Sequence, residues 1–356
     1  MAGFKQTQRF VVEQGASLSR EEACGLITEM LAPTREEESP SDMEIAALLT
    51  AMAMRGETAD ELTGVAEAMR SLAVPLPLME EERANLVDTC GTGGDGLGTF
   101  NISTGAALVA VAAGAHIAKH GNRAVTSQCG SADVLEALGI PVTLEPDAAV
   151  SCLRATGFMF LYAPELHPAL KRVQPVRRSL GFRTIFNLAG PLTNPAGAPA
   201  QVMGVFSESK LMLAAEAMAR LGIEFGMVAH GRNGMDEIAL SVTDAVMVRS
   251  NDGHPSVGRV KYTPDMFGMK RAAVRELMGG ATAAENAAIL EGIFAGEKGA
   301  KRNIVVVNAA AALFVGRVAG SLEEGVQRAA EAIDSGAVRA KLKQLREFGK
   351  TFGREA

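Results

Sequence analysis

The hydrophobic pattern changes near Leu86, and this change constrains the fold more than any other feature of the sequence. From Leu86 onward, apolar runs of strand length alternate with stretches of helical length. Such alternation is typical of an α/β layer built on a mostly parallel sheet. The run at 304–307 fits either a strand or the start of a buried helix, because periodicity does not separate the two. Strands are expected at 86–89, 116–118, 141–144, 158–162, 202–206 and 227–229, and a small-residue helix over about 104–113.

The chain before this change has the pattern of helices only. Capping boxes begin at Ser19, Ser41 and Thr58, where a hydroxyl residue is followed three positions later by glutamate. After the third box, apolar residues recur on one helical face. Pro75 and Pro77 then interrupt the helical pattern. The sequence therefore predicts a small all-helical domain over 1–78 and a larger α/β domain over 79–356.

Composition and charge disfavour several classes of protein. The net charge of −6 disfavours a general nucleic-acid binder, which is more often basic. The four cysteines are scattered without a CxxC pair, so we expect reduced thiols and neither a disulfide framework nor a zinc site. We interpret Cys90 and Cys129 as small packing residues. No segment is apolar and long enough to span a bilayer, and no signal-peptide core is present, so we expect a cytoplasmic protein.

A glycine-rich loop follows the first expected strand. It reads GTGGD at 91–95 and continues as TFNIST at 99–104. Glycines let the backbone bend sharply and present consecutive N–H groups to an anion, and a helix start adds its positive dipole end. The loop is neither a P-loop nor a dinucleotide fingerprint. It predicts a site for phosphate or pyrophosphate, although an ordinary strand-to-helix turn is the alternative.

A second loop follows the next expected strand and reads KHGNR at 119–123. Lys119 and Arg123 can neutralise a phosphate, and Ser127 and Ser131 can donate hydrogen bonds to it. The carboxyl ends of parallel strands lie at one edge of a sheet, so we expect the two loops to form one anion site. His120 fits either a turn-shaping role or a substrate contact.

These motifs occur together with others in a fixed order, and as a set they resemble the anthranilate phosphoribosyltransferase family. The resemblance covers nearly the whole chain. The related pyrimidine nucleoside phosphorylases share the fold but carry a different signature around the second loop. The further matching segments are GSADVLEALG at 130–139, HPA at 167–169, VRRSLG at 176–181, RTIFN at 183–187, GPLTNP at 190–195 and DE at 236–237.

The resemblance implies a nucleoside phosphorylase/phosphoribosyltransferase-like fold and an enzyme of tryptophan biosynthesis. Such an enzyme transfers the phosphoribosyl group of phosphoribosyl pyrophosphate (PRPP) to the amine of anthranilate with Mg²⁺ as cofactor. It also implies that the segment at about 165–190 packs onto the small domain, and that a homodimer forms through that domain. Neither nucleic acid nor a membrane is an implied partner. The alternatives are a relative of the same fold acting on another acceptor, a nucleoside phosphorylase, and a non-catalytic nucleic-acid-binding relative.

The resemblance also assigns roles to residues. Adjacent carboxylates suit Mg²⁺, and an arginine can hold a carboxylate through two hydrogen bonds, so the chemistry of Asp236, Glu237 and Arg177 agrees with these roles. No catalytic acid or base is implied, since the aromatic amine is already unprotonated near neutral pH. The implied anthranilate contacts are Gly91, Asn122 and Arg177, and the implied metal ligands are Ser103, Asp236 and Glu237. The implied PRPP-binding residues are Gly91, Gly94, Asp95, Thr99, Asn101, Ile102, Ser103, Thr104, Lys119, His120, Gly121, Asn122, Arg123, Ala124, Val125, Thr126, Ser127 and Ser131.

Overall fold

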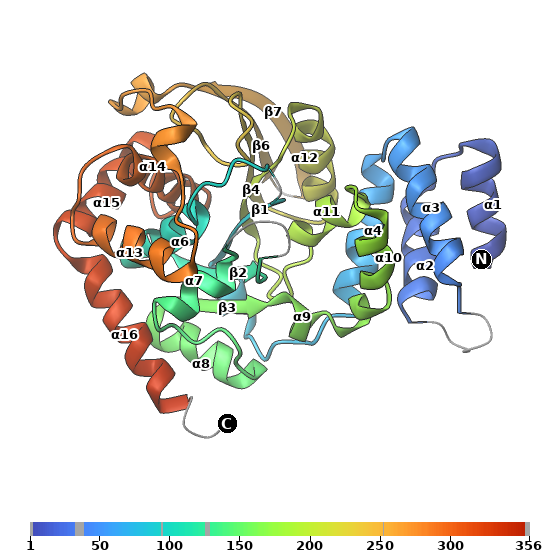
Figure 1. Ribbon diagram of the computed structural model, residues 1–356, viewed down its shortest axis with the longest axis horizontal. Helices are drawn as coiled ribbons and strands as arrows, with labels where there is room; N and C mark the ends of the chain where they lie inside the picture. Colours follow the sequence, from blue (N-terminus) through green and yellow to red (C-terminus); the bar gives the residue numbers. More distant parts are fainter. Residues whose placement is uncertain (1–2, 33–38, 94, 125–128, 252, 353–356) are drawn as a thin grey trace.

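The protein divides into a group of helices at one end and a sheet covered by helices at the other (Figure 1). The structure is a computed structural model and describes residues 3–32, 39–93, 95–124, 129–251 and 253–352. Within these residues, no helix has the length and apolar character needed to cross a membrane. The α/β class expected from the sequence is confirmed.

One seven-stranded sheet, in the order β3-β2-β1-β4-β5-β6-β7, runs through the larger part. The first five strands in this order are parallel, and β6 and β7 form an antiparallel hairpin at one edge. The mostly parallel sheet is as expected, but the hairpin is an addition to it. The strands are β1 (Leu86–Gly91), β2 (His116–Gly121), β3 (Phe158–Tyr162), β4 (Ala200–Gly204), β5 (Phe225–Gly231), β6 (Thr243–Asn251) and β7 (His254–Tyr262).

The register of the parallel strands brings their carboxyl ends to one edge. Gly91 of β1 pairs with Gly204 of β4, Gly204 pairs with Ala229 of β5, and Gly121 of β2 pairs with Tyr162 of β3. The loops that follow β1, β2 and β5 therefore start at the same edge of the sheet. In open parallel sheets this edge is where ligands bind.

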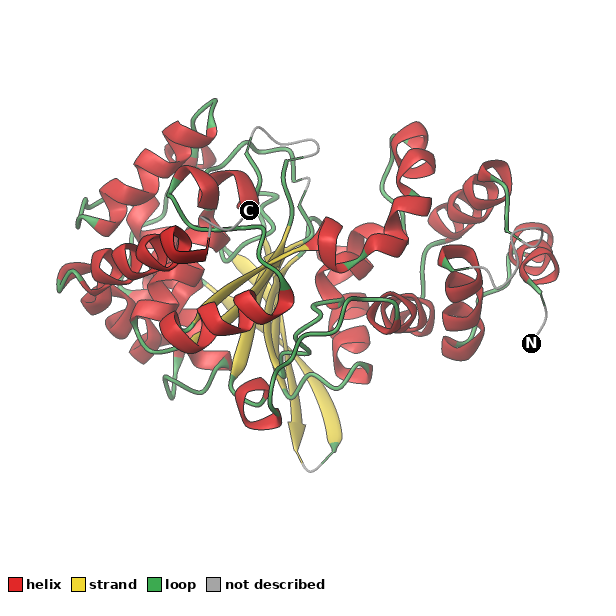
Figure 2. Cartoon of the chain, turned by 90° about the horizontal axis from the view of Figure 1, so that it is seen from below, coloured by secondary structure: helices red, strands yellow, loops and turns green. Residues whose placement is uncertain are grey.

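Helices cover both faces of the sheet (Figure 2). In chain order, the helices of the protein begin with the N-terminal set α1 (Phe4–Gln14), α2 (Arg20–Leu31), α3 (Asp42–Arg55), α4 (Ala59–Ser71) and α5 (Glu80–Arg83). The middle of the chain holds α6 (Ile102–Ala112), α7 (Ser131–Ala137), α8 (Pro146–Thr156), α9 (Ala163–Leu166), α10 (Gln174–Leu180), α11 (Ile185–Ala189) and α12 (Leu211–Arg220). The C-terminal set is α13 (Ala283–Phe294), α14 (Ala300–Val315), α15 (Leu322–Asp334) and α16 (Ala337–Phe352).

Two large buried clusters lie on opposite faces of the sheet, as the alternation of side chains along a strand requires. Met227 and Ala229 of β5 belong to the cluster that contains α6 and α13 to α16. Val228, between them in sequence, belongs to the cluster that contains α12 and the N-terminal helices. The N-terminal helices and the sheet are thus joined by a continuous apolar core.

The N-terminal helices begin where the capping boxes place them. The hydroxyls of Ser19, Ser41 and Thr58 each accept a hydrogen bond from the backbone N–H of the glutamate three residues later, and each glutamate closes the box. These caps satisfy backbone N–H groups that a helix start otherwise leaves unpaired. The three helix starts expected from the sequence are confirmed.

The segment between β3 and β4 packs against the N-terminal helices although it lies far from them in sequence. Val173, Val176 and Ile185 share one buried cluster with Ile27 of α2 and Leu49 of α3. The segment consists of α9 to α11 with the 3₁₀ helices η2 (Pro168–Arg172) and η3 (Gly190–Leu192). It therefore lies between the helical end of the molecule and the sheet.

Two expectations for local structure are settled by packing. The strand expected at 141–144 is wrong: these residues have no regular structure, because Pro141 cannot donate to a sheet ladder and Val142 is buried against helices instead. The run at 304–307 lies inside α14, where all four residues are buried. Burial on all sides explains why it showed no helical periodicity.

Candidate functional site

The loop after β1 lies directly against the carboxylate pair that follows β5. The N–H of Gly93 donates to Asp236 Oδ2 at 2.8 Å, and the N–H of Thr92 donates to Gly204 O at 2.9 Å. A Cβ added at Gly91 would lie 2.8 Å from the same Asp236 oxygen. A larger residue at this position would have to displace the Asp236 carboxylate. The fold thus brings together two motifs that are far apart in sequence.

A segment from the C-terminal half braces the far side of this loop. The N–H of Gly279 donates to Gly98 O at 2.9 Å, and the N–H of Phe100 donates to Leu277 O at 3.3 Å. Leu277 belongs to a short 3₁₀ helix, η6 (Val274–Leu277). Nothing in the sequence marked this segment as part of the site.

The start of α6 is open to an anion. Asn101 precedes the helix, but its side chain makes no capping hydrogen bond. Instead its Nδ2 donates to Cys129 O at 3.1 Å and so ties the first loop to the second. Of the first N–H groups, that of Ile102 donates to Phe100 O at 2.7 Å and that of Ser103 lies against the Glu237 carboxylate. An anion here would face the remaining N–H groups and the positive end of the helix dipole.

Lys119 lies beneath the two loops and is only 1% exposed. Its Nζ donates to Thr89 O at 2.5 Å and to Ser103 Oγ at 3.3 Å. Burial lowers the pKa of Lys119, while the charges of Asp88 and other nearby acidic groups raise it. The sequence suggested a phosphate contact, and the structure places this ammonium between the end of β1 and the start of α6.

Arg123 makes ion pairs that the sequence did not suggest. Its guanidinium lies 2.6 Å from each carboxylate oxygen of Glu136 and 3.2 Å from Asp133 Oδ1. The Glu136 carboxylate raises the pKa of Arg123. An anion at the second loop would compete with these two acids for the guanidinium. Ser131 begins α7 beside this loop, and the site residues expected at Gly94, Val125, Thr126 and Ser127 lie outside the described residues.

Asp236 and Glu237 concentrate negative charge after β5. Burial, followed by the charge of Asp95, raises the pKa of Asp236 to about 6. Burial, followed by the charge of Asp236, raises the pKa of Glu237 well above its usual range, and the Lys119 ammonium opposes this. A divalent cation would relieve the repulsion between these carboxylates.

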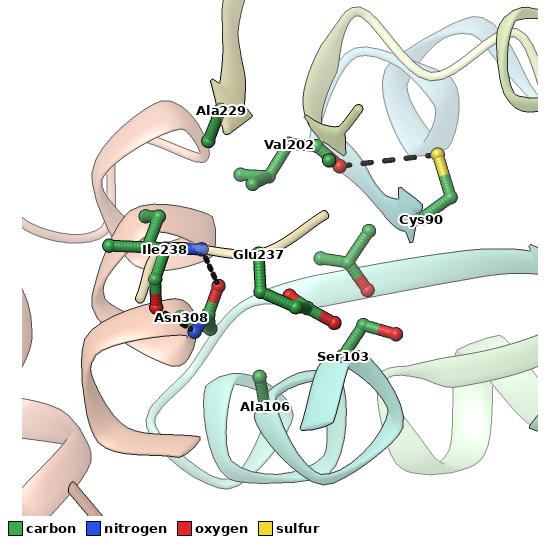
Figure 3. Close-up of a pocket in the computed structure, with 10 residues that line it drawn as sticks. Cys90, Ser103, Ala106, Val202, Ala229, Glu237, Ile238 and Asn308 are labelled. Carbon is green, nitrogen blue, oxygen red and sulfur yellow. Dashed lines mark hydrogen bonds between the residues drawn. The ribbon is translucent and has the colours of Figure 1, made fainter. Parts of the chain in front are cut away.

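The donor set fits Mg²⁺. Carboxylate and hydroxyl oxygens are the hard ligands this ion prefers, and Ser103 Oγ lies in the same small pocket as Glu237 (Figure 3). No three His, Cys, Asp or Glu side chains in the described part of the chain are grouped to hold a metal by themselves. Mg²⁺ usually keeps several waters and bridges to substrate phosphates, so two protein carboxylates suffice. The pocket is lined by Thr89, Cys90, Ser103, Ala106, Val202, Gly204, Ala229, Glu237, Ile238 and Asn308.

Arg177 is half-buried on α10, a helix that lies between the N-terminal helices and the sheet (Figure 1). Its guanidinium lies over the ring of Phe186, 5.4 Å from the centroid. Burial lowers the pKa of Arg177, and no carboxylate of the described residues forms an ion pair with it. By contrast, Arg172 pairs with Asp42. A half-buried guanidinium without an acidic partner suits the carboxylate of a ligand.

His120 lies with its ring 5.0 Å from the ring of His167, centroid to centroid, and both side chains are buried. Burial, followed by the effect of His167, lowers the pKa of His120 to about 3, so the imidazole is neutral near pH 7. Its backbone N–H donates to Asp88 Oδ1 at 3.3 Å. His120 therefore joins the sheet edge to the segment that packs on the N-terminal helices.

The four cysteines are free thiols in the structure. Burial raises the pKa of Cys129 to about 11 and that of Cys90 well above its usual range. Neither side chain is a ready nucleophile, because the thiolate is the reactive form. The interpretation of both as packing residues agrees with this chemistry.

Two family models match the chain. The α/β-domain model of the glycosyl transferase family matches residues 83–339, and the helical-bundle-domain model of that family matches residues 12–73. Curated relatives are similar over most of their length. The anthranilate phosphoribosyltransferase of Solibacter usitatus is 52% identical over 86% of this chain and 89% of its own. That of Pelotomaculum thermopropionicum is 48% identical over 95% and 94%.

Solved structures share the whole architecture. The crystal structure of anthranilate phosphoribosyltransferase from Thermus thermophilus is 42% identical, covers 96% of this chain and 98% of its own, and has a TM-score of 0.86. The Saccharomyces cerevisiae enzyme in complex with PRPP and Mg is 25% identical over 98% of each chain, with a TM-score of 0.84. The same yeast enzyme in complex with 4-fluoroanthranilate has a TM-score of 0.83 at the same identity and coverage.

Proposed function

The chain belongs to the anthranilate phosphoribosyltransferase family, and from this premise we propose which of its residues serve each substrate. As a member of this family the protein is a transferase of tryptophan biosynthesis. It transfers the phosphoribosyl group of PRPP to the amine of anthranilate and releases pyrophosphate. One observation carries the site assignment: the glycine loop, the uncapped start of α6 and the carboxylate pair meet at one edge of the sheet.

The two loops bind PRPP. The uncapped start of α6 offers N–H groups to phosphate oxygens, and Asn101, Ser103 and Thr104 add polar side chains there. The second loop contributes Asn122 and Arg123. In the absence of ligand, Glu136 and Asp133 compensate the Arg123 charge, and PRPP replaces them. The remaining assigned contacts are Gly91, Gly94, Asp95, Thr99, Ile102, Lys119, His120, Gly121, Ala124, Val125, Thr126, Ser127 and Ser131.

Ser103, Asp236 and Glu237 hold Mg²⁺ at the pyrophosphate end of PRPP. When bound, Mg²⁺ supplies positive charge against the oxygens of the leaving pyrophosphate. The buried ammonium of Lys119, bonded to Ser103 Oγ, adds a fixed positive charge on the protein side. The pocket shared by Ser103 and Glu237 supports this assignment.

Anthranilate binds with its carboxylate on Arg177, and Gly91 and Asn122 contact the remainder of the molecule. The guanidinium of Arg177, which forms no ion pair with the described residues, supports this orientation. The bond between the amine nitrogen and ribose C1 forms as the bond from C1 to the pyrophosphate oxygen breaks, and one amine proton is lost. Because the amine is already unprotonated, the protein contributes positioning and electrostatics and no strong general base.

Anthranilate fluorescence tests the reaction. Purified protein mixed with PRPP, anthranilate and MgCl₂ should consume anthranilate and so reduce the fluorescence. The same mixture with EDTA should stay fluorescent, because the metal is removed. If folded protein at high concentration gives no metal-dependent loss, the substrate assignment is wrong and other aromatic amines and nucleosides become the substrates to screen.

We also propose a cytoplasmic homodimer that forms through the small helical domain, residues 1–78. Four large apolar side chains of α1 and α3 are exposed, and these two helices pack on each other at the far end of the molecule (Figure 1). Exposed apolar side chains on two neighbouring helices are candidates for an interaction surface. The four are Phe10, Val12, Met43 and Met54, and the two methionines are 81% and 84% exposed.

A further inference from the structure

Asn308, on the buried helix α14, holds the backbone of Ile238 with both ends of its side-chain amide. Its Oδ1 accepts the Ile238 N–H at 3.0 Å, and its Nδ2 donates to Ile238 O and to Ile304 O, each at 2.9 Å. Figure 3 shows the two bonds between Asn308 and Ile238 at the wall of the pocket that contains Glu237. Asn308 itself is only 4% exposed.

The backbone held in this way has no regular structure of its own. The chain between β5 and β6 forms turns and bends, yet Ile238 is 1% exposed. Buried backbone N–H and C=O groups need partners, and Asn308 supplies one for each group of Ile238. A side chain thus takes the place of a neighbouring strand at this point.

Glu237 lies between two anchored residues. On one side, the Asp236 backbone lies against β4 so closely that a Cβ at Gly204 would come within 1.6 Å of Asp236 O. On the other side, Asn308 fixes Ile238. With both neighbours fixed, the backbone of Glu237 and the direction of its Cα–Cβ bond are fixed too, and its side chain lines the pocket that also contains Ser103.

We propose that Asn308 is a positioning residue for the transfer reaction, which fixes the backbone of Ile238 and thereby aims Glu237 at the Mg²⁺–pyrophosphate end of PRPP. This inference rests on the proposed function. Asn308 touches neither substrate nor metal, and it acts through the backbone next to a carboxylate ligand. Removing a group that orients a metal ligand in this way typically lowers metal affinity or activity by about 10–100-fold.

Calorimetric titration of PRPP into the protein, with and without MgCl₂ and with no anthranilate present, tests this role without relying on turnover. In Asn308→Leu, which keeps the size of the side chain and removes its hydrogen bonds, the PRPP affinity in MgCl₂ should fall by roughly 10-fold or more. The affinity without MgCl₂ and the KM for anthranilate should stay as in the wild type. Asn308→Ala is the second variant if the leucine variant does not fold.

Asn303→Leu is the matched control, because Asn303 lies on the same helix about 140° away around its axis. It should retain the wild-type Mg²⁺ dependence, and urea denaturation should show all variants folded. Two results overturn the inference: a folded Asn308 variant with wild-type PRPP affinity in MgCl₂, or one whose PRPP affinity falls equally with and without the metal. A wild-type protein that consumes no anthranilate would instead remove the proposed function.

Discussion

Arg177 is the residue on which recognition of the acceptor depends in the proposed site. Its guanidinium is half-buried and has no acidic partner among the described residues, so an incoming carboxylate can form two charge-assisted hydrogen bonds with it. Such bonds contribute about 1.5–3 kcal/mol. We therefore expect Arg177→Ala to raise the KM for anthranilate by roughly 10–100-fold while the KM for PRPP changes little.

Steady-state kinetics with each substrate varied in turn measures this effect. Arg178→Ala is the control, because Arg178 is the exposed neighbour on the same helix and should leave both constants unchanged. Aniline, which lacks the carboxylate, should be used equally poorly by the wild type and by Arg177→Ala. An unchanged anthranilate KM in Arg177→Ala would remove the assignment.

His120 makes the stability of the protein depend on pH. Burial lowers the pKa of His120 from 6.5 to about 3. Below pH 6.5 the unfolded chain therefore binds a proton that the folded protein excludes, and stability falls as the pH drops through this window. For one such group, each unit of pH below 6.5 lowers the free energy of unfolding by at most about 1.4 kcal/mol. Near pH 5, His120 alone should therefore lower it by roughly 2 kcal/mol.

Urea denaturation at a series of pH values measures how the free energy of unfolding changes with pH. In His120→Asn the loss of stability between pH 6.5 and about pH 5 should be smaller than in the wild type by roughly 2 kcal/mol. His254→Asn serves as the control, since His254 lies exposed on β7 and its removal should leave the slope unchanged. If the free energy of unfolding depends on pH in the same way in the wild type and in His120→Asn, the imidazole titrates normally in the folded state.

At the scale of elements, the sequence predicted those helices and strands whose boundaries depend on residues close together in the chain. The three N-terminal helix starts followed from hydroxyl–glutamate pairs, which act within one turn. The β6–β7 hairpin was missed because β6 is apolar on both faces, and because β7 is an exposed edge strand with a proline and a glycine. An Asp-Gly pair at 252–253 was the turn signal available for it.

The brace on the glycine loop gives an element-scale prediction. A Cβ at Gly279 would lie 3.1 Å from Phe100 N and 2.7 Å from Asn286 Oδ1, so Gly279→Ala should push the Asn286 amide aside and press on the backbone that leads into α6. Displacements on the order of 1 Å can cost about 100-fold in rate. We expect the KM for PRPP to rise by roughly 10-fold or more, with the KM for anthranilate unchanged.

Initial rates at varied PRPP measure this change. Gly258→Ala is the control, because nothing lies within 4 Å of a Cβ added at that exposed glycine of β7. If Gly279→Ala binds PRPP as the wild type does, the pairing of Gly279 with Gly98 has no part in shaping the anion site.

At the scale of the whole molecule, the candidate site was predictable in part. Glycine loops after successive strands pointed to one edge of the sheet before the fold was known. Gly279 and Asn308 could not be found in this way, because they are neutral residues whose roles arise only from contacts between distant parts of the chain. Arg123 was expected to neutralise a phosphate, and its ion pairs with Asp133 and Glu136 of α7 could not be predicted because they depend on how that helix packs.

The homodimer that we propose rests on the exposed apolar side chains of α1 and α3. Met43 and Met54 are 81% and 84% exposed, so glutamate at both positions should fit the monomer without strain. Two buried charges in an interface lack partners and are strongly unfavourable, so Met43→Glu/Met54→Glu should weaken the dimer by roughly 100-fold or more. Sedimentation equilibrium over a range of concentrations measures the dissociation constant. Met266→Glu, at an exposed methionine of the α/β part, should leave it unchanged. A double variant that stays as dimeric as the wild type would place the interface on another surface, and a wild-type monomer would remove the dimer altogether.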